Sequence, residues 1–150
     1  MYPEEALRPM RQELTNIGFR ELRSAQEVDA ALKQEQRTTL VVVNSVCGCA
    51  AGKARPAIAK ALSNSARPEV LLTVFAGQDA EATDRARSYF TGYMPSSLSV
   101  ALFRDGKVVF MLERRNIESS DPYSISQALT QAFDRFCTVS PAATTGSASK

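Results

Sequence analysis

The sequence predicts an α/β fold, in which a mixed β-sheet is covered by helices on both faces. Two β-branched apolar runs, 38–43 and 70–75, alternate with segments of helical period, as in strands buried on both sides. Further along, Asp105-Gly106 lies between two apolar runs, the strongest short-range signal of a hairpin. Together these features predict strands joined by helices, with an antiparallel hairpin near the C-terminal end.

The N-terminal part of the chain contains two predicted helices. Residues 3–16 repeat apolar side chains at three- and four-residue steps, and Gly18 fits the C′ position that ends such a helix. The capping-box spacing of Ser24 and Glu27 predicts that a second helix begins there. A short strand is expected between them, at 19–22. The sheet is therefore preceded by an N-terminal helical extension.

Three further helices are expected. Helical spacing continues from the first apolar strand to Leu62, and Pro56 should kink that helix or restart it. Residues 79–90 are also helical in character. Asp121-Pro122 predicts the start of the last helix, because proline fits the first helical position.

The domain organisation follows from where these elements stop. We expect one folded unit over residues 1–138. The remainder, 139–150, is rich in Ser, Thr, Ala and Gly, and this composition predicts a disordered tail.

Composition excludes several classes of function. The chain has 150 residues, of which 44% are hydrophobic and 23% charged, as in an ordinary globular protein. Its formal net charge of +2 argues against a role driven by nucleic-acid binding. The chain has no histidine, which excludes Ser-His-Asp triads, Cys-His dyads and HExxH zinc sites.

Charge along the chain bears on location. Charged residues interrupt the first 23 positions, so no apolar core of a signal peptide is present. Apolar runs such as 40–43 and 108–112 are far too short to span a membrane. We expect no membrane partner and a cytoplasmic location, where structural disulfides are rare.

The chemistry of the chain is expected at Cys47 and Cys49, which follow the first apolar strand at the start of a helix. Unpaired N–H groups and the positive end of the helix dipole favour an anion there, so the pKa of an exposed thiol should fall. Cys47 lies further outside the helix and should be the attacking nucleophile, whereas Cys49 is better placed to resolve a mixed disulfide. Gly48 between them lets the backbone bend.

The cysteine pair could instead serve core packing or metal ligation. Packing is disfavoured at a loop-to-helix junction beside glycine. A zinc or iron–sulfur site needs about four ligands, and only Cys137 remains to join the pair. We therefore expect redox chemistry, with no metal and no bound cofactor. Cys137 lies four residues after Phe133 and is interpreted as a small buried hydrophobe.

Two basic residues, Lys53 and Arg55, lie one to two turns into the same helix. They could support a thiolate or an anionic thiol substrate. Since basic residues on helices are mostly solvated, we interpret them as part of an exposed helix face.

The segment TLVVVNSVCGCAAGKARPA, residues 39–57, resembles the bacilliredoxin family, thioredoxin-like proteins with a CGC motif. The resemblance extends to the blocks RPMRQELTNIGF, ELRSAQEVD, TVFAGQDAEAT, YFTGYMPSS and ALFRDGKVVF. It covers nearly the whole chain up to Cys137. The CGC motif alone is a weak pattern, but within these blocks it is highly specific. The resemblance implies a thioredoxin-like mixed sheet.

The resemblance also implies a function. Bacilliredoxins remove bacillithiol, a low-molecular-weight thiol, from proteins with which it has formed mixed disulfides. By that likeness Cys47 attacks and takes the thiol, Cys49 can resolve the intermediate, and the thiol is a co-substrate. The expected partners are thiol-modified or disulfide-containing proteins. A protein disulfide isomerase is the alternative enzyme, and a CxC metal-binding protein is the non-enzyme alternative.

Two departures from the family bear on mechanism. Leu98 stands at the place of the thioredoxin fold's cis-proline, and a cis bond before a non-proline residue costs about 3 kcal/mol. The strand at 40–43 is wholly apolar, where thioredoxin-type proteins carry a buried acid. With no carboxylate to deprotonate Cys49, we favour a cycle that an external thiol completes.

Overall fold

The computed structural model describes residues 2–46, 48–93 and 98–138 of the chain. Strands and helices alternate through most of this part. Their order is α1 (Glu4–Thr15), β1 (Arg20–Glu21), α2 (Ala25–Leu32), β2 (Thr39–Asn44), α3 (Gly48–Ala61), β3 (Val70–Phe75), α4 (Ala80–Ser88), β4 (Ser99–Arg104), β5 (Lys107–Glu113), α5 (Arg114–Glu118) and α6 (Pro122–Phe136).

The strands form one mixed sheet in the order β1-β3-β2-β4-β5. β3 pairs in parallel with both β1 and β2. β4 runs antiparallel to β2 and to β5. The predicted α/β class with a mixed sheet is confirmed, and the arrangement is consistent with a thioredoxin-like fold.

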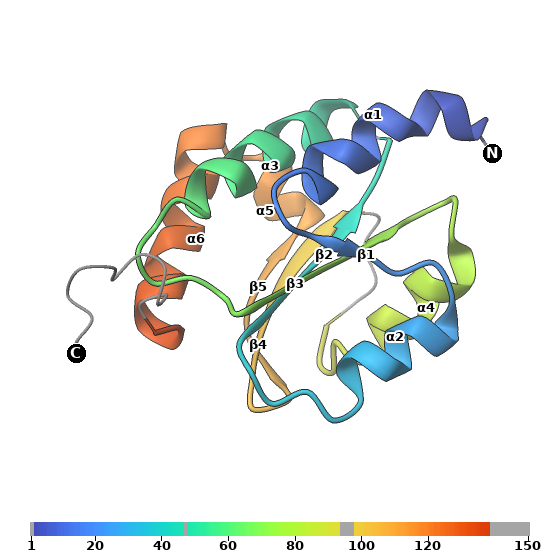
Figure 1. The fold of residues 1–150 in the computed structure, drawn as a ribbon. Helices are drawn as coiled ribbons and strands as arrows, with labels where there is room; N and C mark the ends of the chain where they lie inside the picture. Colours follow the sequence, from blue (N-terminus) through green and yellow to red (C-terminus); the bar gives the residue numbers. More distant parts are fainter. Residues whose placement is uncertain (1, 47, 94–97, 139–150) are drawn as a thin grey trace.

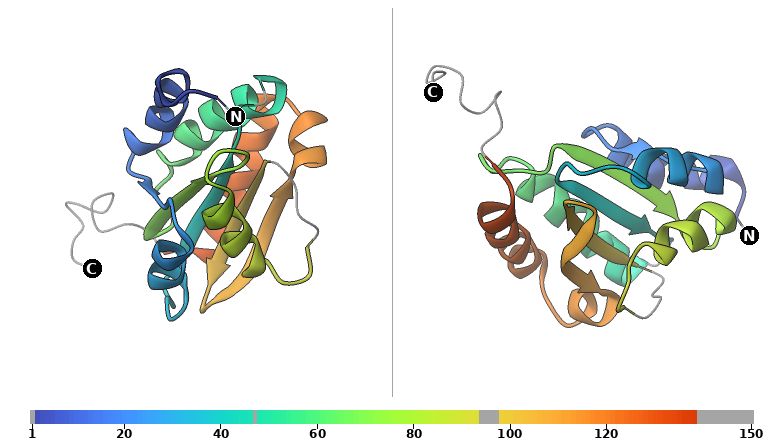
Figure 2. Two further views of the ribbon diagram at one scale, coloured as in Figure 1. Left: turned by 90° about the vertical axis from the view of Figure 1, so that its right-hand side faces the viewer. Right: turned by 90° about the horizontal axis from the view of Figure 1, so that it is seen from below.

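Helices cover both faces of the sheet, as predicted. Figures 1 and 2 show α3 and α6 on one face and α2 and α4 on the other. The buried residues divide accordingly into two clusters. One contains side chains of α3 and α6, and the other contains side chains of α2 and α4.

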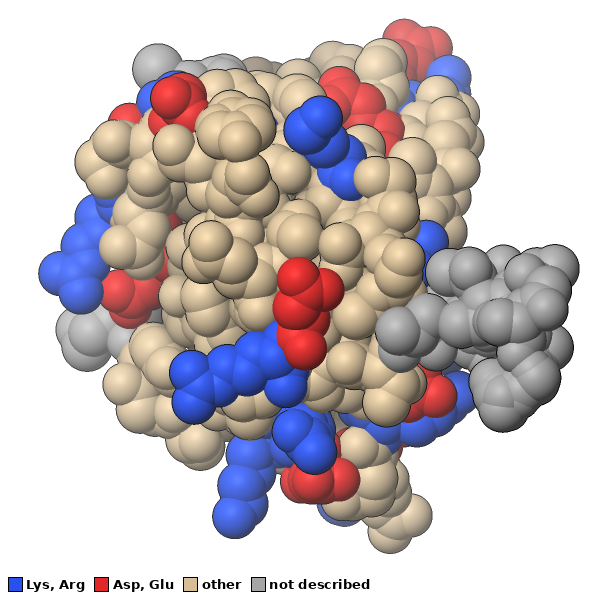
Figure 3. Space-filling view, turned by 90° about the vertical axis from the view of Figure 1, so that its left-hand side faces the viewer, with Lys and Arg blue, Asp and Glu red and all other residues tan. Residues whose placement is uncertain are grey.

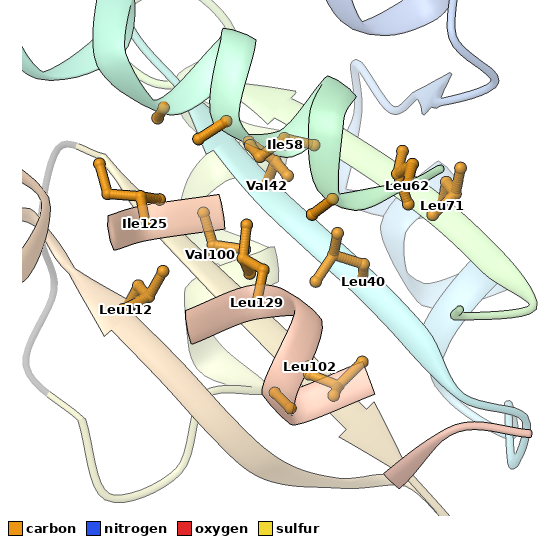
Figure 4. Packing of buried hydrophobic residues seen from close by; sticks show 14 of the residues in the cluster. Leu40, Val42, Ile58, Leu62, Leu71, Val100, Leu102, Leu112, Ile125 and Leu129 are labelled. Atoms are coloured by element: carbon orange, nitrogen blue, oxygen red, sulfur yellow. The ribbon is translucent and has the colours of Figure 1, made fainter. Parts of the chain in front are cut away.

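β2 lies in the middle of the sheet and contributes side chains to both clusters, as its neighbours β3 and β4 also do. All six of its residues are buried, because successive side chains point to opposite faces and both faces are covered. Leu40 and Val42 pack under α3 and α6 beside Val100 and Leu129 (Figure 4). The sequence is continuously apolar here for this reason.

Local signals in the sequence account for the ends of several elements. Asp105 and Gly106 have φ angles of 54° and 80°, as a two-residue hairpin turn requires. Ser24 Oγ accepts a hydrogen bond from the Glu27 backbone N–H at 3.1 Å, which caps α2. Asp121 caps α6 in the same way, through the N–H of Ser124 at 2.7 Å. The turns and caps predicted from these residues are confirmed.

Several expectations are corrected or not addressed. α3 is continuous through Pro56, so proline does not restart the helix. Gly18 has the positive φ of a helix-ending glycine, but it lies two residues past the C-cap Asn16 rather than at C′. The sequence does not predict α5. The predicted disordered tail, 139–150, lies outside the described residues.

The outer surface of α6 carries little charge. Its exposed residues from Pro122 to Gln131 are all uncharged. Figure 3, which faces the side of the molecule where α6 lies, shows mostly uncharged surface with scattered basic and acidic side chains. None of the helices in the described part of the chain combines the length and apolar character of a membrane span.

The packing of α6 on the sheet gives a prediction for stability. Leu129 is fully buried against β2 and β4, so Leu129→Ala should lower the free energy of unfolding by about 2–5 kcal/mol through lost burial and a residual cavity. Urea denaturation measures this. Gln131→Ala, on the exposed side of the same helix, is the control and should change it by less than about 0.5 kcal/mol. Similar losses in both variants would contradict the packing described.

Candidate active site

In the sequence, the predicted cysteine pair stands where the central strand β2 is followed by helix α3. β2 ends at Asn44 and α3 begins at Gly48. The backbone of Cys49 belongs to the first turn of α3, as predicted. Cys47, the predicted attacking residue, lies outside the described residues. The first backbone N–H groups of a helix have no partner within it, so this junction favours an anion.

A buried polar network lies at this junction. Asn44 is buried at the end of β2, and its Nδ2 donates to the Met10 carbonyl of α1 at 3.2 Å. Its Oδ1 accepts from the backbone N–H of Ser45 at 2.9 Å and from Arg55 Nη1 at 3.0 Å. Arg55 Nη1 also donates to the Ser45 carbonyl at 3.1 Å. The network ties the end of the strand to α1 and α3.

Arg55 is not on an exposed helix face, and that expectation was wrong. Its side chain is only 9% exposed, and its Nε donates to Glu13 Oε1 of α1 at 2.8 Å. The signal was present in the sequence. Arg55 lies beside Ala54 and three residues before Ile58, on the side of α3 that faces the core. A basic residue within an apolar helical face requires buried partners.

Lys53 is only partly exposed, so the expected solvated face describes it only in part. Its Nζ donates to the Glu118 carbonyl at 2.9 Å, at the end of α5. A cation there satisfies a carbonyl that the helix leaves without a partner. Lys53 thereby connects the first turns of α3 to α5.

The strand that precedes the cysteines in the sequence carries no acid. Residues 40–43 are all buried and apolar. The carboxylate that joins the network is Glu13, whose side chain is 48% exposed. The buried charge next to the junction is therefore a guanidinium. Such a group stabilises an anion but does not accept a proton.

A second ion cluster holds α1 in place. Arg11 is buried and binds Glu4 at 2.9 Å, Asp79 at 2.8 Å and Glu21. Burial alone would lower the pKa of Arg11, but hydrogen bonds to Asp79, Glu21 and Glu4 raise it on balance. The cluster joins α1 to β1 and to the residue before α4. It keeps Glu13, on the same helix, in position to meet Arg55.

Cys137 has the structural role predicted for it. It is the C-cap residue of α6, is partly buried and packs against the hydrophobic core. Burial raises the pKa of its thiol to about 11. Such a thiol is a poor nucleophile at neutral pH.

Cys137 also lies far from the first turn of α3. Asn64 Nδ2, just after α3, donates to Asp134 Oδ1 near the end of α6 at 2.9 Å, so the C-terminal ends of these helices are neighbours. α3 has 14 residues and is about 21 Å long at 1.5 Å per residue. Cys137 is therefore separated from Cys49 by about the length of α3.

Two further expectations are not decided by the described residues. Leu98 is fully buried, but the peptide bond before it belongs to Ser97, outside the described part. No group of three or more His, Cys, Asp or Glu in the described residues could hold a metal ion. Cys47 does not belong to that set, so the absence of a metal stays a prediction.

Comparison with known proteins places the chain in a family. Residues 2–137 match the model of a protein family described as "Disulphide isomerase". The chain is 56% identical to a bacilliredoxin of Koribacter versatilis, over 91% of this chain and 94% of that protein. It is 53% identical to a bacilliredoxin of Salinibacter ruber, over 91% and 81%, and 48% identical to one of Staphylococcus aureus, over 91% and 94%.

The chain belongs to the bacilliredoxin family. The resemblance found in the sequence is confirmed. Membership in the bacilliredoxin family supports a thiol–disulfide redox function for this chain and an oxidoreductase role. In the fold described above, the buried guanidinium of Arg55, in the middle of α3, contacts the residues that end β2 just before the helix begins.

The raised pKa of Cys137 gives a prediction for stability against pH. The unfolded thiol ionises near its ordinary pKa of 9.0, whereas the folded thiol ionises near 11. Cys137 therefore contributes stability that is fully present below pH 9 and is lost as the pH rises from about 9 to 11. Denaturation of the reduced protein and of Cys137→Ala should show their stability difference shrinking over this range. A difference independent of pH would contradict it.

Proposed function

We propose that the chain is a thiol–disulfide oxidoreductase that removes bacillithiol, or a similar low-molecular-weight thiol, from protein mixed disulfides. The observation that supports the proposal is the end of β2 at Asn44 and the start of α3 at Gly48, on either side of Cys47 in the sequence, with the buried guanidinium of Arg55 bound to the Ser45 carbonyl. The bacilliredoxin names of relatives at 48–56% identity support it.

The first step is a thiol–disulfide exchange. The Cys47 thiolate attacks the bacillithiol sulfur of the mixed disulfide, and a new S–S bond forms between Cys47 and bacillithiol. The old S–S bond breaks, and the substrate protein's sulfur leaves with the electron pair as a thiolate that takes a proton from water. The rate depends on the thiolate fraction of Cys47 and on the pKa of the leaving thiol.

The second step frees Cys47. An external thiolate attacks the bacillithiol sulfur, forms a low-molecular-weight disulfide and restores the Cys47 thiolate. Alternatively, Cys49 attacks Cys47, which releases bacillithiol and forms a Cys47–Cys49 disulfide that an external dithiol then reduces. We favour the first route, because the apolar strand β2 offers no carboxylate to deprotonate Cys49.

The proposal includes the surroundings of this reaction. The co-substrate is the low-molecular-weight thiol, with no bound cofactor or metal. The partners are thiol-modified or disulfide-containing proteins, and neither nucleic acid nor a membrane takes part. The reaction belongs in the reducing cytoplasm, where a supply of reduced thiol is available.

Protein disulfide isomerisation is the second candidate. The description of the matching family, "Disulphide isomerase", favours it. Isomerisation also begins with attack by Cys47, but the attacked disulfide is within a protein. It is distinguished by recovery of native disulfides in a scrambled substrate protein when Cys47 is the only cysteine of the motif.

Cysteine variants test the proposal. Cys49→Ser should retain the first step, since Cys47 alone makes the attack. Cys47→Ser should abolish it, because a hydroxyl without a base is a far weaker nucleophile and the chain has no histidine to act as one. The measurement is mass spectrometry of a bacillithiol-modified substrate protein incubated with each variant.

Cys137→Ser is the matched control, since it removes a thiol that lies about a helix length from the first turn of α3, and it should react like the unsubstituted protein. Equal loss of activity in Cys47→Ser and Cys49→Ser would show that Cys49 is needed for the attack and would contradict the division of roles. Activity on scrambled disulfides without removal of bacillithiol would favour the isomerase.

A further inference from the structure

The polar contacts of Arg55 converge on the residues that lead into the CGC motif. Its Nη1 donates to Asn44 Oδ1 at 3.0 Å and to the Ser45 carbonyl at 3.1 Å. Ser45 precedes Cys47 by two residues in the sequence. Arg55 thus joins the middle of α3 to the segment between β2 and the motif.

The two partners of the Arg55–Glu13 ion pair differ in their exposure to water. The guanidinium side chain is 9% exposed, whereas its partner Glu13 is 48% exposed. Water screens the carboxylate of Glu13 more than it screens the buried guanidinium. The ion pair therefore does not cancel at the inner side of the junction, and a net positive potential adds to that of the α3 N-terminus.

We infer that Arg55 is a positioning residue of the redox motif: its guanidinium fixes Asn44 and the Ser45 carbonyl and favours the anionic form of the Cys47 thiol. The inference rests on the proposed function, in which the thiolate is the reactive form. Its basis is the contact of the buried Arg55 guanidinium with the end of β2, which carries no charged residue.

The neighbouring charged groups at the junction are placed differently. Lys53 on α3 is partly exposed and bound to the Glu118 carbonyl of α5. Asp121, before α6, has its pKa lowered mainly by hydrogen bonds from Ser124 and in part by the charge of Lys53. These two opposite charges offset each other in solvent. Arg55 differs from them because it is buried.

The test compares three variants in a Cys49→Ser, Cys137→Ser background, where Cys47 is the one remaining thiol. Arg55→Met removes the charge and keeps the length of the side chain. Arg55→Lys keeps the charge without the planar donor group. Glu13→Gln is the matched control, because it alters the same ion pair from the other side. The readout is the rate of iodoacetamide alkylation as a function of pH.

Arg55→Met should raise the midpoint of the pH–rate profile by about one unit, which lowers the thiolate fraction about tenfold well below the midpoint. Arg55→Lys should recover at least half of that shift, since the positive charge returns. Glu13→Gln should lower the midpoint or leave it unchanged, because the guanidinium loses the carboxylate that offsets it.

A merely structural Arg55–Glu13 pair would give a different pattern. Both Arg55→Met and Glu13→Gln would then raise the midpoint, because the first removes and the second weakens the same Nε–Oε1 contact, and this result would overturn the inference. No shift in Arg55→Met would also overturn it. Circular dichroism shows whether Arg55→Met folds. If it does not, the other two variants decide: an upward shift of the midpoint in Glu13→Gln, or an upward shift of more than one unit in a folded Arg55→Lys, overturns the inference. The absence of both shifts supports the inference.

Alkylation requires no bacillithiol, so the two proposals can fail separately. A shifted profile in a protein that does not remove bacillithiol would leave the role of Arg55 intact and contradict the proposed function. An unshifted profile in a protein that does remove bacillithiol would support the proposed function and contradict the role of Arg55.

Discussion

The burial of β2 on both faces is the constraint on which the rest of the structure depends. Its six residues are buried between two neighbouring strands and two helical layers. An apolar strand of this kind has one favourable place, the middle of a covered sheet. Once β2 is fixed there, the chain leaves the sheet at Asn44, and α3 must begin within a few residues. The position of the CGC motif follows from this exit.

The same constraint determines which polar groups can reach the motif. β2 contains no acidic residue, so the charge at its end comes from neighbouring helices. α3 contributes the guanidinium of Arg55 and α1 contributes Glu13, with α1 held in place by the Arg11 cluster. A guanidinium favours a thiolate but takes no proton from a thiol. This is the physical reason to assign the attack to one cysteine and the completion of the cycle to an external thiol.

Much of the fold could be predicted because its signals are local. The run 38–43, the Asp105-Gly106 turn and the Asp121 cap each specify an element within a few residues. α5 was missed because it has five residues, too few to show a helical period, and is defined by reciprocal bonds between Glu113 and Asn116. The cysteine pair was predicted from spacing and from family resemblance. The apolar side of α3 could have indicated that Arg55 is buried, but its partners could not be predicted because they come from separate elements, one of them 42 positions away.

The central claim is that the motif at the start of α3 carries the reaction and that Cys47 receives the thiol. The most direct measurement is a rapid-quench time course of the unsubstituted protein with a bacillithiol-modified substrate, in which tandem mass spectrometry locates every adduct. The account predicts that bacillithiol is found first on Cys47, while the substrate protein appears as its free thiol at the same rate. First appearance of the adduct on Cys49 or Cys137, or release of the substrate thiol without any adduct on the chain, would contradict it.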